Sequence, residues 1–475
     1  MPAAASDNRS LKLADVVPFR GLRYNREAVP DLSQAISPPY DIISPAGQKR
    51  YHEKSPFNAI RLDFGMELPG DSDTNNRYTR AAALLREWLS GGVLIPEDSP
   101  AFYLCREEFL LGDGSPATRD GFIALIRLSD FSEGVVLPHE ETASGPKADR
   151  LRLMEATAAN LSAIYCLYSD PGHSVIRELQ AGAGGEPDAR LTDDAGTVHS
   201  LWVVKDRERT AAVNAILAGK TLLIADGHHR YETALAYRDA RREEEGRRGV
   251  SSGENSGGEP SSGDDASAGR PHDFLMVYLS DMDNTGPAIL PIHRFVSGLS
   301  GETAGNLPAL LSENFEVTEV GGEGLARQQN MIAAMADADP ARNVFGMYLP
   351  GAGRYYLLAG REPRPMVGSK ENGRSAAYRS LDVAVLDHAI LAETLRIRPG
   401  GVNEASRVRF VERTEKAFKE INSSTAADFD AAFFLNPTSM QEIKAVAEAG
   451  EKMPQKSTYF YPKPVTGLVF RSFNY

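Results

Sequence analysis

A group of ionisable side chains directly follows an apolar run in the stretch TLLIADGHHRYETALAYRD, residues 221–239. Five residues stand where the apolar run gives way to a helix-like pattern: Asp226, Gly227, His228, His229 and Arg230. An acid at such a junction can hold Mg²⁺ or accept a proton from a hydroxyl group. Two histidines and an arginine add hydrogen-bond donors and positive charge. These residue types predict an anion site with acid–base chemistry beside it.

A strand, a tight turn and a helix are needed to position these side chains. TLLIAD is typical of a buried strand, and HHRYETALAYRDARREEE of an amphipathic helix. Gly227 falls at the turn, where glycine permits positive φ. The first N–H groups of a helix lack intrahelical partners and, with the helix dipole, favour an anion. A helix cap is the simpler alternative for Asp226 alone.

Further polar clusters could join this site. PHEETASGPKADR, residues 138–150, combines acids, a histidine and cations, although a solvated charged loop is the alternative. Lys147 and Arg150 have the chemistry of phosphate ligands. ILPIHRF, residues 289–295, ends an apolar strand with a histidine and an arginine, and a core histidine bonded to the backbone is the alternative.

Two more segments lie near the ends of the sequence. The consecutive prolines of SPPYDII are expected to hold Tyr40 and Asp41 rigidly, so this segment either is structural or lines the pocket. MPQKSTYFYPK lacks the phosphate-loop frame G-x-x-x-x-G-K-[ST], but three of its side chains could meet an anion: Lys456, Ser457 and Thr458.

Composition narrows the class of protein. Only Cys105 and Cys166 are present among 475 residues, so no disulfide framework is expected and the reducing cytoplasm is favoured. The formal net charge of −13 argues against nucleic acid as a partner. No stretch approaches the roughly 18 apolar residues of a membrane span, and the first residues do not resemble a signal peptide. The oligomeric state is left open.

Strand and helix patterns alternate along the chain, which predicts an α/β or mixed α+β fold. We expect an N-terminal mixed α/β region (1–110), a catalytic core (111–298) and a C-terminal α/β region (299–475). A Gly- and Ser-rich disordered insertion is expected at 241–272. Residues 58–65 are predicted as a strand, 76–92 as a helix, and 273–282 with 286–295 as a hairpin.

Six segments in order resemble the bacterial family called domain of unknown function 1015: SPPYDII, PHEETASGPKADR, ADGHHRYETAL, LPIHR, FFLNPT and MPQKSTYFYPK. ADGHHR also resembles the signature of the ParB/sulfiredoxin superfamily, and most closely that of its free L-serine kinases. The run lacks the cysteine of sulfiredoxins. The resemblance implies a ParB/sulfiredoxin-like core with additional α/β regions, and phosphorylation of a small hydroxy amino acid such as L-serine to O-phospho-L-serine.

The resemblance also implies roles for individual residues. Glu140, with Glu141 as runner-up, takes the hydroxyl proton, and Asp226 and His229 complete the catalytic set, with Asp226 orienting the hydroxyl or holding Mg²⁺. Phosphate is bound by Gly227, His228, Arg230, Lys147 and Arg150. The substrate is contacted by His139, His293, Arg294 and Tyr40.

The donor could be pyrophosphate, ATP or ADP. Since no pocket specific for a nucleotide base is recognisable in the sequence, pyrophosphate is slightly favoured. A nucleotide-sensing regulatory protein without catalysis is one alternative function. A phosphatase that acts on phosphoserine with the same site is another.

Overall fold

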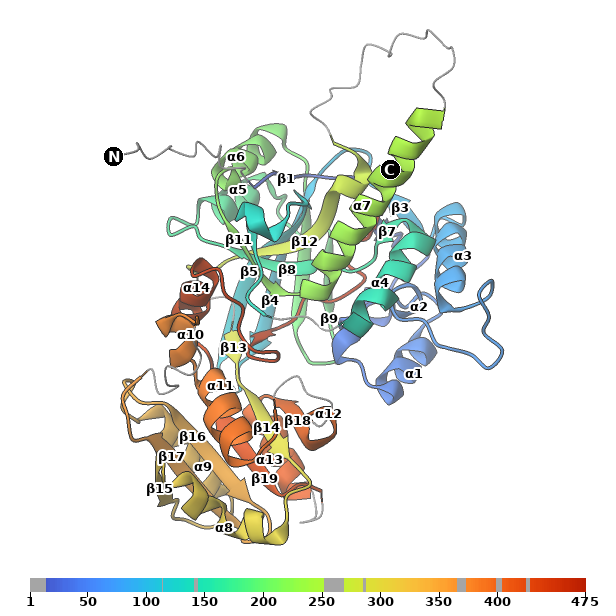
Figure 1. Ribbon diagram of the computed structural model, residues 1–475. Coiled ribbons are helices and arrows are strands. Elements are labelled where there is room, and N and C mark those ends of the chain that lie inside the picture. Colours follow the sequence, from blue (N-terminus) through green and yellow to red (C-terminus); the bar gives the residue numbers. More distant parts are fainter. Residues whose placement is uncertain are drawn as a thin grey trace.

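The computed structural model describes residues 14–475 except for 113, 141–143, 252–268, 285–287, 365–372, 399–403 and 424–427. The described chain has a mixed α/β fold with two large sheets, as the sequence predicts. The sheet of the first lobe lies in the upper half of Figure 1, and the sheet of the second lobe lies in the lower half.

The sheet of the first lobe has nine strands in the order β6-β11-β8-β12-β5-β4-β10-β9, with β1 beside β5. β12 runs parallel to β8 and β11 parallel to β6, whereas the other pairs are antiparallel. The sheet takes strands from both sides of residue 110. Its strands are β1 (Val16–Val17), β4 (Phe102–Leu110), β5 (Pro116–Arg127), β6 (Val136–Leu137), β8 (Ile164–Tyr168), β9 (Ala189–Thr192), β10 (Val198–Val204), β11 (Leu222–Asp226) and β12 (Phe274–Asp281).

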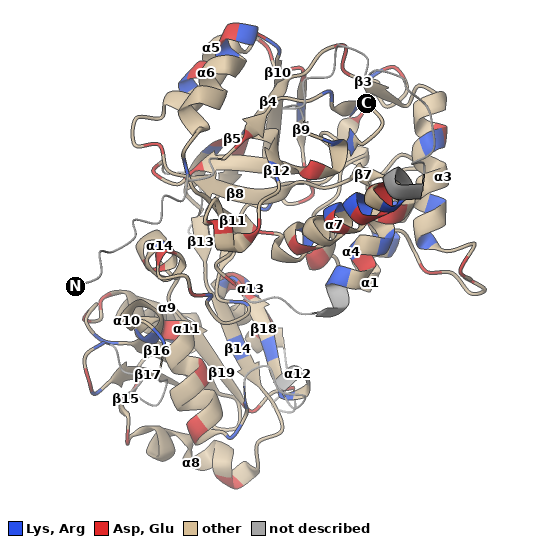
Figure 2. Ribbon diagram, turned by 45° about the horizontal axis from the view of Figure 1, so that its top comes forward, with Lys and Arg blue, Asp and Glu red and all other residues tan. Residues whose placement is uncertain are grey.

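Three helices bury apolar side chains against one face of this sheet: α5 (Ser174–Gly182), α6 (Arg207–Leu217) and α7 (His228–Ser251). α4 (Ser144–Thr157) packs on α7, and α3 (Arg77–Ser90) packs on α4. Asn76 caps α3, which confirms the helix predicted there. Acidic and basic residues are interspersed along α4 and α7 (Figure 2). None of the described helices is both long and apolar enough to cross a membrane.

The second lobe is built on a six-stranded antiparallel sheet in the order β15-β17-β16-β19-β14-β18. Its strands are β14 (Ile292–Val296), β15 (Phe315–Glu319), β16 (Val344–Leu349), β17 (Arg354–Gly360), β18 (Val408–Glu412) and β19 (Ala431–Leu435). Its helices are α8 (Gly301–Leu311), α9 (Gly324–Ala336), α10 (Ala376–Ser380), α11 (Asp382–Val385), the π-helix η5 (Leu386–Thr394), α12 (Glu404–Arg407), α13 (Thr414–Ser423) and α14 (Met440–Glu448).

After α14 the chain returns to the first lobe. β20 (Tyr459–Tyr461) pairs with β13 (Ala288–Leu290), and β21 (Arg471–Ser472) pairs with β7 (Ala159–Asn160). Phe460 belongs to one hydrophobic cluster that continues from the large sheet into the second lobe. Residues 449–475, which we call the returning segment, therefore join parts of the chain that are far apart in sequence.

Short elements complete the N-terminal part of the first lobe. β2 (Leu22–Tyr24) pairs with β3 (Leu94–Pro96). The helices are α1 (Pro45–Lys54) and α2 (Ile60–Asp63), and the 3-10 turns are η1 (Leu32–Gln34), η2 (Tyr40–Ile42), η3 (Phe131–Glu133) and η4 (Pro271–Asp273).

Three expectations about local structure are wrong. Residues 58–65 contain the helix α2, because the Asn58 side chain accepts from the Ile60 N–H and closes a turn. The predicted hairpin is absent, since β12 lies between β5 and β8 while β14 belongs to the other sheet. The insertion does not start at residue 241, because α7 continues to Ser251; residues 252–268 lie outside the described part.

Candidate functional site

The strand, turn and helix predicted around the Asp-Gly-His-His-Arg run are present. β11 ends at Asp226 and α7 begins at His228. Gly227 between them has a φ of +94°, which residues with a Cβ rarely adopt. A Cβ on Gly227 would lie 2.9 Å from Cγ2 of Ile164. The turn therefore needs glycine both for its backbone angle and for its close contact with β8.

The carboxylate of Asp226 lies between two cations. Its Oδ1 is 2.7 Å from Nζ of Lys463, and its Oδ2 is 2.9 Å from Nη2 of Arg230. Lys463 also reaches Oδ2 of Asp41 at 2.5 Å. Arg230 is held in place because it donates to the Ala163 carbonyl at 2.8 Å. The returning segment thus ties the start of α7 to η2 through one lysine.

The charges of this cluster stabilise one another. Burial raises the pKa of Asp226, but Lys463 and Arg230 more than offset it, so that the pKa lies below its usual value. Burial lowers the pKa of Lys463, and the carboxylates of Asp226 and Asp41 raise it to a net value above the usual one. Asp226 is therefore ionised and Lys463 protonated at neutral pH.

Two buried histidines next to the cluster are neutral. Nδ1 of His139 donates to the Ile224 carbonyl at 2.5 Å, so Nε2 accepts from the Thr458 hydroxyl at 2.9 Å. Nε2 of His228 accepts from the backbone N–H of His139 at 3.3 Å, which places the ring proton on Nδ1. Burial lowers the pKa of His139 to about 4 and that of His228 well below its usual value. Neither ring carries charge at neutral pH.

Lys456 has a left-handed backbone conformation, and both its N–H and its carbonyl form hydrogen bonds with side chains. Its φ is +59°, an uncommon value for a residue with a side chain. Its N–H donates to Oε1 of Glu140 at 2.8 Å, and its carbonyl accepts from Nη2 of Arg294 at 3.1 Å. Burial raises the pKa of Glu140 in spite of this hydrogen bond. Glu140 is consequently a stronger base than an exposed glutamate.

These groups converge on one cavity of about 110 Å³, which we call the reaction cavity. Its wall comes from η2, from the junction of β11 and α7, and from the returning segment. His229, half-buried, also lies in this wall. The cavity collects seven of the predicted site residues: Tyr40, Glu140, Asp226, Gly227, His228, His229 and Arg230. It is also lined by Asp41, Ile42, Ala225, Ile292, Glu412, Gln455, Lys456, Thr458, Tyr459 and Lys463.

Lys147 and Arg150 do not line the reaction cavity. The ammonium of Lys147 pairs with Glu232 of α7, which does not line the cavity either. Arg150 donates to Oδ1 of Asp63 at 3.2 Å, and its guanidinium lies 4.0 Å from the centre of the Tyr40 ring. Arg150 is thus placed behind Tyr40, which it supports. Glu141 lies outside the described residues.

His139, His293 and Arg294 lie behind the wall of the reaction cavity. His293 is fully buried, where Nε2 contacts the Thr414 hydroxyl at 3.1 Å and Nδ1 accepts from the Leu435 N–H at 3.3 Å. This arrangement matches the alternative of a core histidine. Arg294 supports Lys456 through the backbone, and His139 supports Thr458.

Sequence reasoning missed Lys463. The residue ends the segment MPQKSTYFYPK, but no local pattern indicates that its side chain reaches Asp226. Its side chain is only 7% exposed, which is rare for a lysine without a buried partner. A lysine in an aromatic and proline-rich run, YFYPK, was the available signal.

The predicted role of Asp226 as a Mg²⁺ ligand does not fit its surroundings. Both carboxylate oxygens already contact cations, Lys463 and Arg230. Within the described ranges, no group of three or more His, Cys, Asp or Glu side chains could hold a metal ion. Mg²⁺ is often held by few protein carboxylates together with substrate phosphates. Any Mg²⁺ would therefore depend on the phosphates of a bound donor.

Comparisons with known proteins give one family and several distant structures. A family described as protein of unknown function (DUF1015) matches residues 16–384. A variant of free serine kinase in complex with ADP aligns with a TM-score of 0.31 at 11% identity, covering 69% of this chain and 84% of the other. C-terminally truncated SbnI from Staphylococcus aureus aligns with a TM-score of 0.31 at 11% identity, covering 72% and 85%. No curated protein matches the sequence.

Proposed function

We propose a function for this chain, which belongs to the DUF1015 family: it transfers a phosphoryl group to the hydroxyl of a small amino acid, most simply free L-serine. One observation carries the proposal. A buried acid, Asp226, is held by two cations at the start of a helix, and a second acid of raised pKa, Glu140, lines the same small cavity. The resemblance of ADGHHR to free L-serine kinases supports the same chemistry.

In phosphoryl transfer the protein mainly positions the reactants and neutralises the charge of the transferred group. The hydroxyl oxygen of serine attacks the terminal phosphorus of the donor, forming a new O–P bond while the bond from phosphorus to the bridging oxygen breaks. Glu140 accepts the hydroxyl proton. The products are O-phospho-L-serine and the donor shortened by one phosphoryl group, and no atom is left unaccounted for.

The cavity offers donors for the transferred group. A lysine has three N–H groups, and Lys463 directs two of them to Asp226 and Asp41, so the third can reach into the cavity. The first N–H groups of α7 carry the positive end of the helix dipole. Lys456 and His228 also line this cavity.

Asp226 acts in this scheme on the position of its neighbours and of the acceptor. Its pairs with Lys463 and Arg230 keep both cations at the cavity. Because it stays ionised, it can also accept a hydrogen bond from the acceptor hydroxyl or from the amino group of serine.

Phosphorus NMR on the full-length protein tests the proposal. The protein is incubated with L-serine and Mg²⁺ and, in separate tubes, with ATP, ADP or pyrophosphate. We expect the O-phosphoserine resonance to grow in at least one tube and to be absent when Glu140→Gln replaces the wild type. No product in any tube would reject the assignment.

Two alternatives give different results in the same experiment. A phosphatase would consume added O-phosphoserine and release orthophosphate without any donor. A regulatory protein would bind a nucleotide and form no product.

A further inference from the structure

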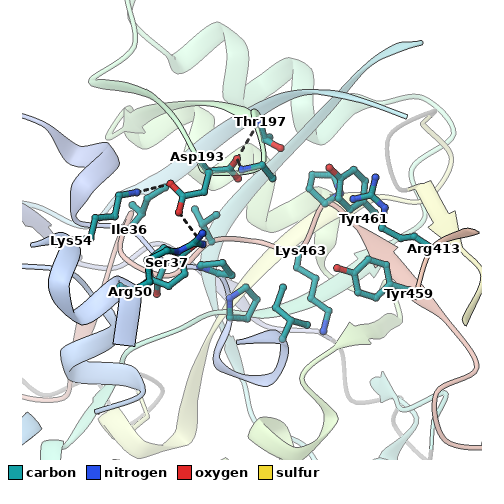
Figure 3. Close-up of a pocket in the computed structure, with 18 residues that line it drawn as sticks. Ile36, Ser37, Arg50, Lys54, Asp193, Thr197, Arg413, Tyr459, Tyr461 and Lys463 are labelled. Atoms are coloured by element: carbon teal, nitrogen blue, oxygen red, sulfur yellow. Dashed lines mark hydrogen bonds and ion pairs between the residues drawn. The ribbon is translucent and has the colours of Figure 1, made fainter. Parts of the chain in front are cut away.

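A second cavity of about 270 Å³ adjoins the reaction cavity, and we call it the side cavity (Figure 3). The two share Ile42, Tyr459 and Lys463 in their walls. Lys463 therefore stands between them, with its ammonium on Asp226 of the reaction cavity. A ligand that fills the side cavity can extend to Lys463 without leaving the protein surface.

The walls of the side cavity are largely apolar and aromatic. Proline and aliphatic side chains form one part: Ile36, Pro38, Pro39, Pro462 and Val465. Tyr459 and Tyr461 form another part, with ring centres 6.5 Å apart and ring planes inclined by only 24°. Flat apolar walls and tyrosine rings suit a planar heterocycle, which gains free energy from buried area and from ring contacts.

Cations surround this apolar surface. Arg50 and Lys54 of α1 share the carboxylate of Asp194, at 3.3 and 2.7 Å. From the second lobe, the guanidinium of Arg413 lies 4.8 Å from the centre of the Tyr461 ring. A positive φ of +71° at Arg413 and a hydrogen bond from its N–H to the Pro291 carbonyl hold this residue in place. Cationic side chains beside an aromatic wall match a ligand with a flat apolar end and an anionic end.

We propose that the side cavity binds the nucleoside of a nucleotide phosphoryl donor, with the phosphate chain directed past Lys463 to the start of α7. This inference rests on the proposed function and names its donor class. Pyrophosphate has no apolar surface and would leave the tyrosine and proline walls without a partner. Serine is small enough for the reaction cavity and needs no second one.

Calorimetric titration of the full-length protein tests the inference, because binding is measured without turnover. ADP, adenosine and pyrophosphate are titrated separately into the wild type and three variants. Ala195→Trp places a large side chain in the cavity at an exposed lining residue, and Arg50→Ala removes a surrounding cation. Lys49→Ala, on the same helix but not in the lining, is the matched control.

We expect ADP to bind the wild type more tightly than pyrophosphate does, and adenosine to bind measurably. Ala195→Trp should weaken ADP by about tenfold or more and leave pyrophosphate within about twofold. Arg50→Ala should weaken ADP, and Lys49→Ala should not. Equal ADP affinity in the wild type, Ala195→Trp and Arg50→Ala would overturn the inference.

The phosphoserine assay on the same samples separates this inference from the proposed function. If ADP binding depends on the side cavity but no product forms, the inference of a nucleotide site is supported and the proposed kinase activity is rejected. If product forms from pyrophosphate and the protein does not bind ADP, the proposed kinase activity is supported and the inference of a nucleotide site is rejected.

Discussion

The ammonium of Lys463 lies 2.7 Å from the carboxylate of Asp226. Asp226 ends a strand of the large sheet, whereas Lys463 follows β20 in the returning segment. The side chains are 17% and 7% exposed, so little water screens the pair. The pair therefore connects two distant parts of the chain and lines the reaction cavity.

Lys463→Met should strongly destabilise the protein and abolish phosphoserine formation. The substitution removes the cation that contacts Oδ1 of Asp226 and leaves a buried carboxylate underpaired. Removing one partner of a buried ion pair costs about 3–5 kcal/mol. Urea unfolding followed by circular dichroism measures the loss of stability, and the phosphorus NMR assay measures the loss of activity.

A double variant separates charge pairing from chemistry. Asp226→Asn combined with Lys463→Met should recover part of the stability lost by Lys463→Met alone, because a neutral amide then replaces the buried carboxylate that has lost its lysine. The recovery is only partial because Arg230 and Asp41 each lose a partner. Activity should stay absent. Additive losses in the double variant would show that the two residues are not coupled.

Glu140→Gln should lower kcat by about 10²- to 10⁴-fold and leave the fold intact. The amide oxygen can still accept the N–H of Lys456, but an amide cannot take up the hydroxyl proton. Initial rates at saturating serine measure kcat, and thermal unfolding checks the fold. Glu412→Gln, in the same cavity but paired with Lys416, is the control and should keep most of the activity.

The wild-type rate should also rise with pH through the pKa of Glu140. An exposed glutamate has a pKa of about 4.3. Because burial raises the pKa of Glu140, the rate should rise at a pH above that value. The rate should rise with pH because only the ionised carboxylate of Glu140 can accept the hydroxyl proton. A rate that falls with increasing pH over the acidic range would contradict the assignment.

Gly227→Ala should cost roughly 1–3 kcal/mol and reduce activity. The new Cβ would meet Cγ2 of Ile164 at 2.9 Å in a backbone conformation with φ of +94°, so the turn and the start of α7 must shift. Gly246→Ala on the same helix is the matched control, because nothing lies within 4 Å of its Cβ. It should stabilise α7 by up to about 1 kcal/mol. Chemical denaturation of both variants gives the comparison.

Stability should fall as the pH is lowered from about 6.5 to about 4, with His139 as one cause. Its pKa is about 4 in the folded protein and about 6.5 in an unfolded chain. Over this interval the unfolded chain binds a proton that the folded protein does not, so protons favour unfolding by about 3 kcal/mol. Urea unfolding at several pH values measures the slope. His139→Gln should have the smaller slope, and equal slopes would exclude this residue.

The core of the site was predictable from the sequence because its geometry is local. An apolar run, a glycine and a helical pattern specify a strand, a turn and a helix, and they fix where Asp226 and Arg230 emerge. Residues 58–65 were wrongly predicted as a strand, because the side chain of Asn58 accepts a hydrogen bond from the backbone and closes a turn instead.

Long-range partners were not predictable in the same way. Arg150 and Arg294 have the residue type of phosphate ligands, yet one lies against Tyr40 and the other holds the Lys456 carbonyl. A single sequence shows that an arginine can bind an anion, but it does not show which oxygen the arginine will meet. Lys463 was missed for the same reason, since its partners are set by the pairing of β20 with β13.

The returning segment orders events during synthesis of the protein. Asp41 and Asp226 leave the ribosome long before Lys463, which must cross back to both. Since chains emerge at about 5–20 residues per second, the first lobe has many seconds in which its sheet can form while the two acids still lack their shared cation. The nascent chain therefore passes through a stage in which Asp41 and Asp226 are present without Lys463, and the lining of the reaction cavity is complete only after residue 463 has docked.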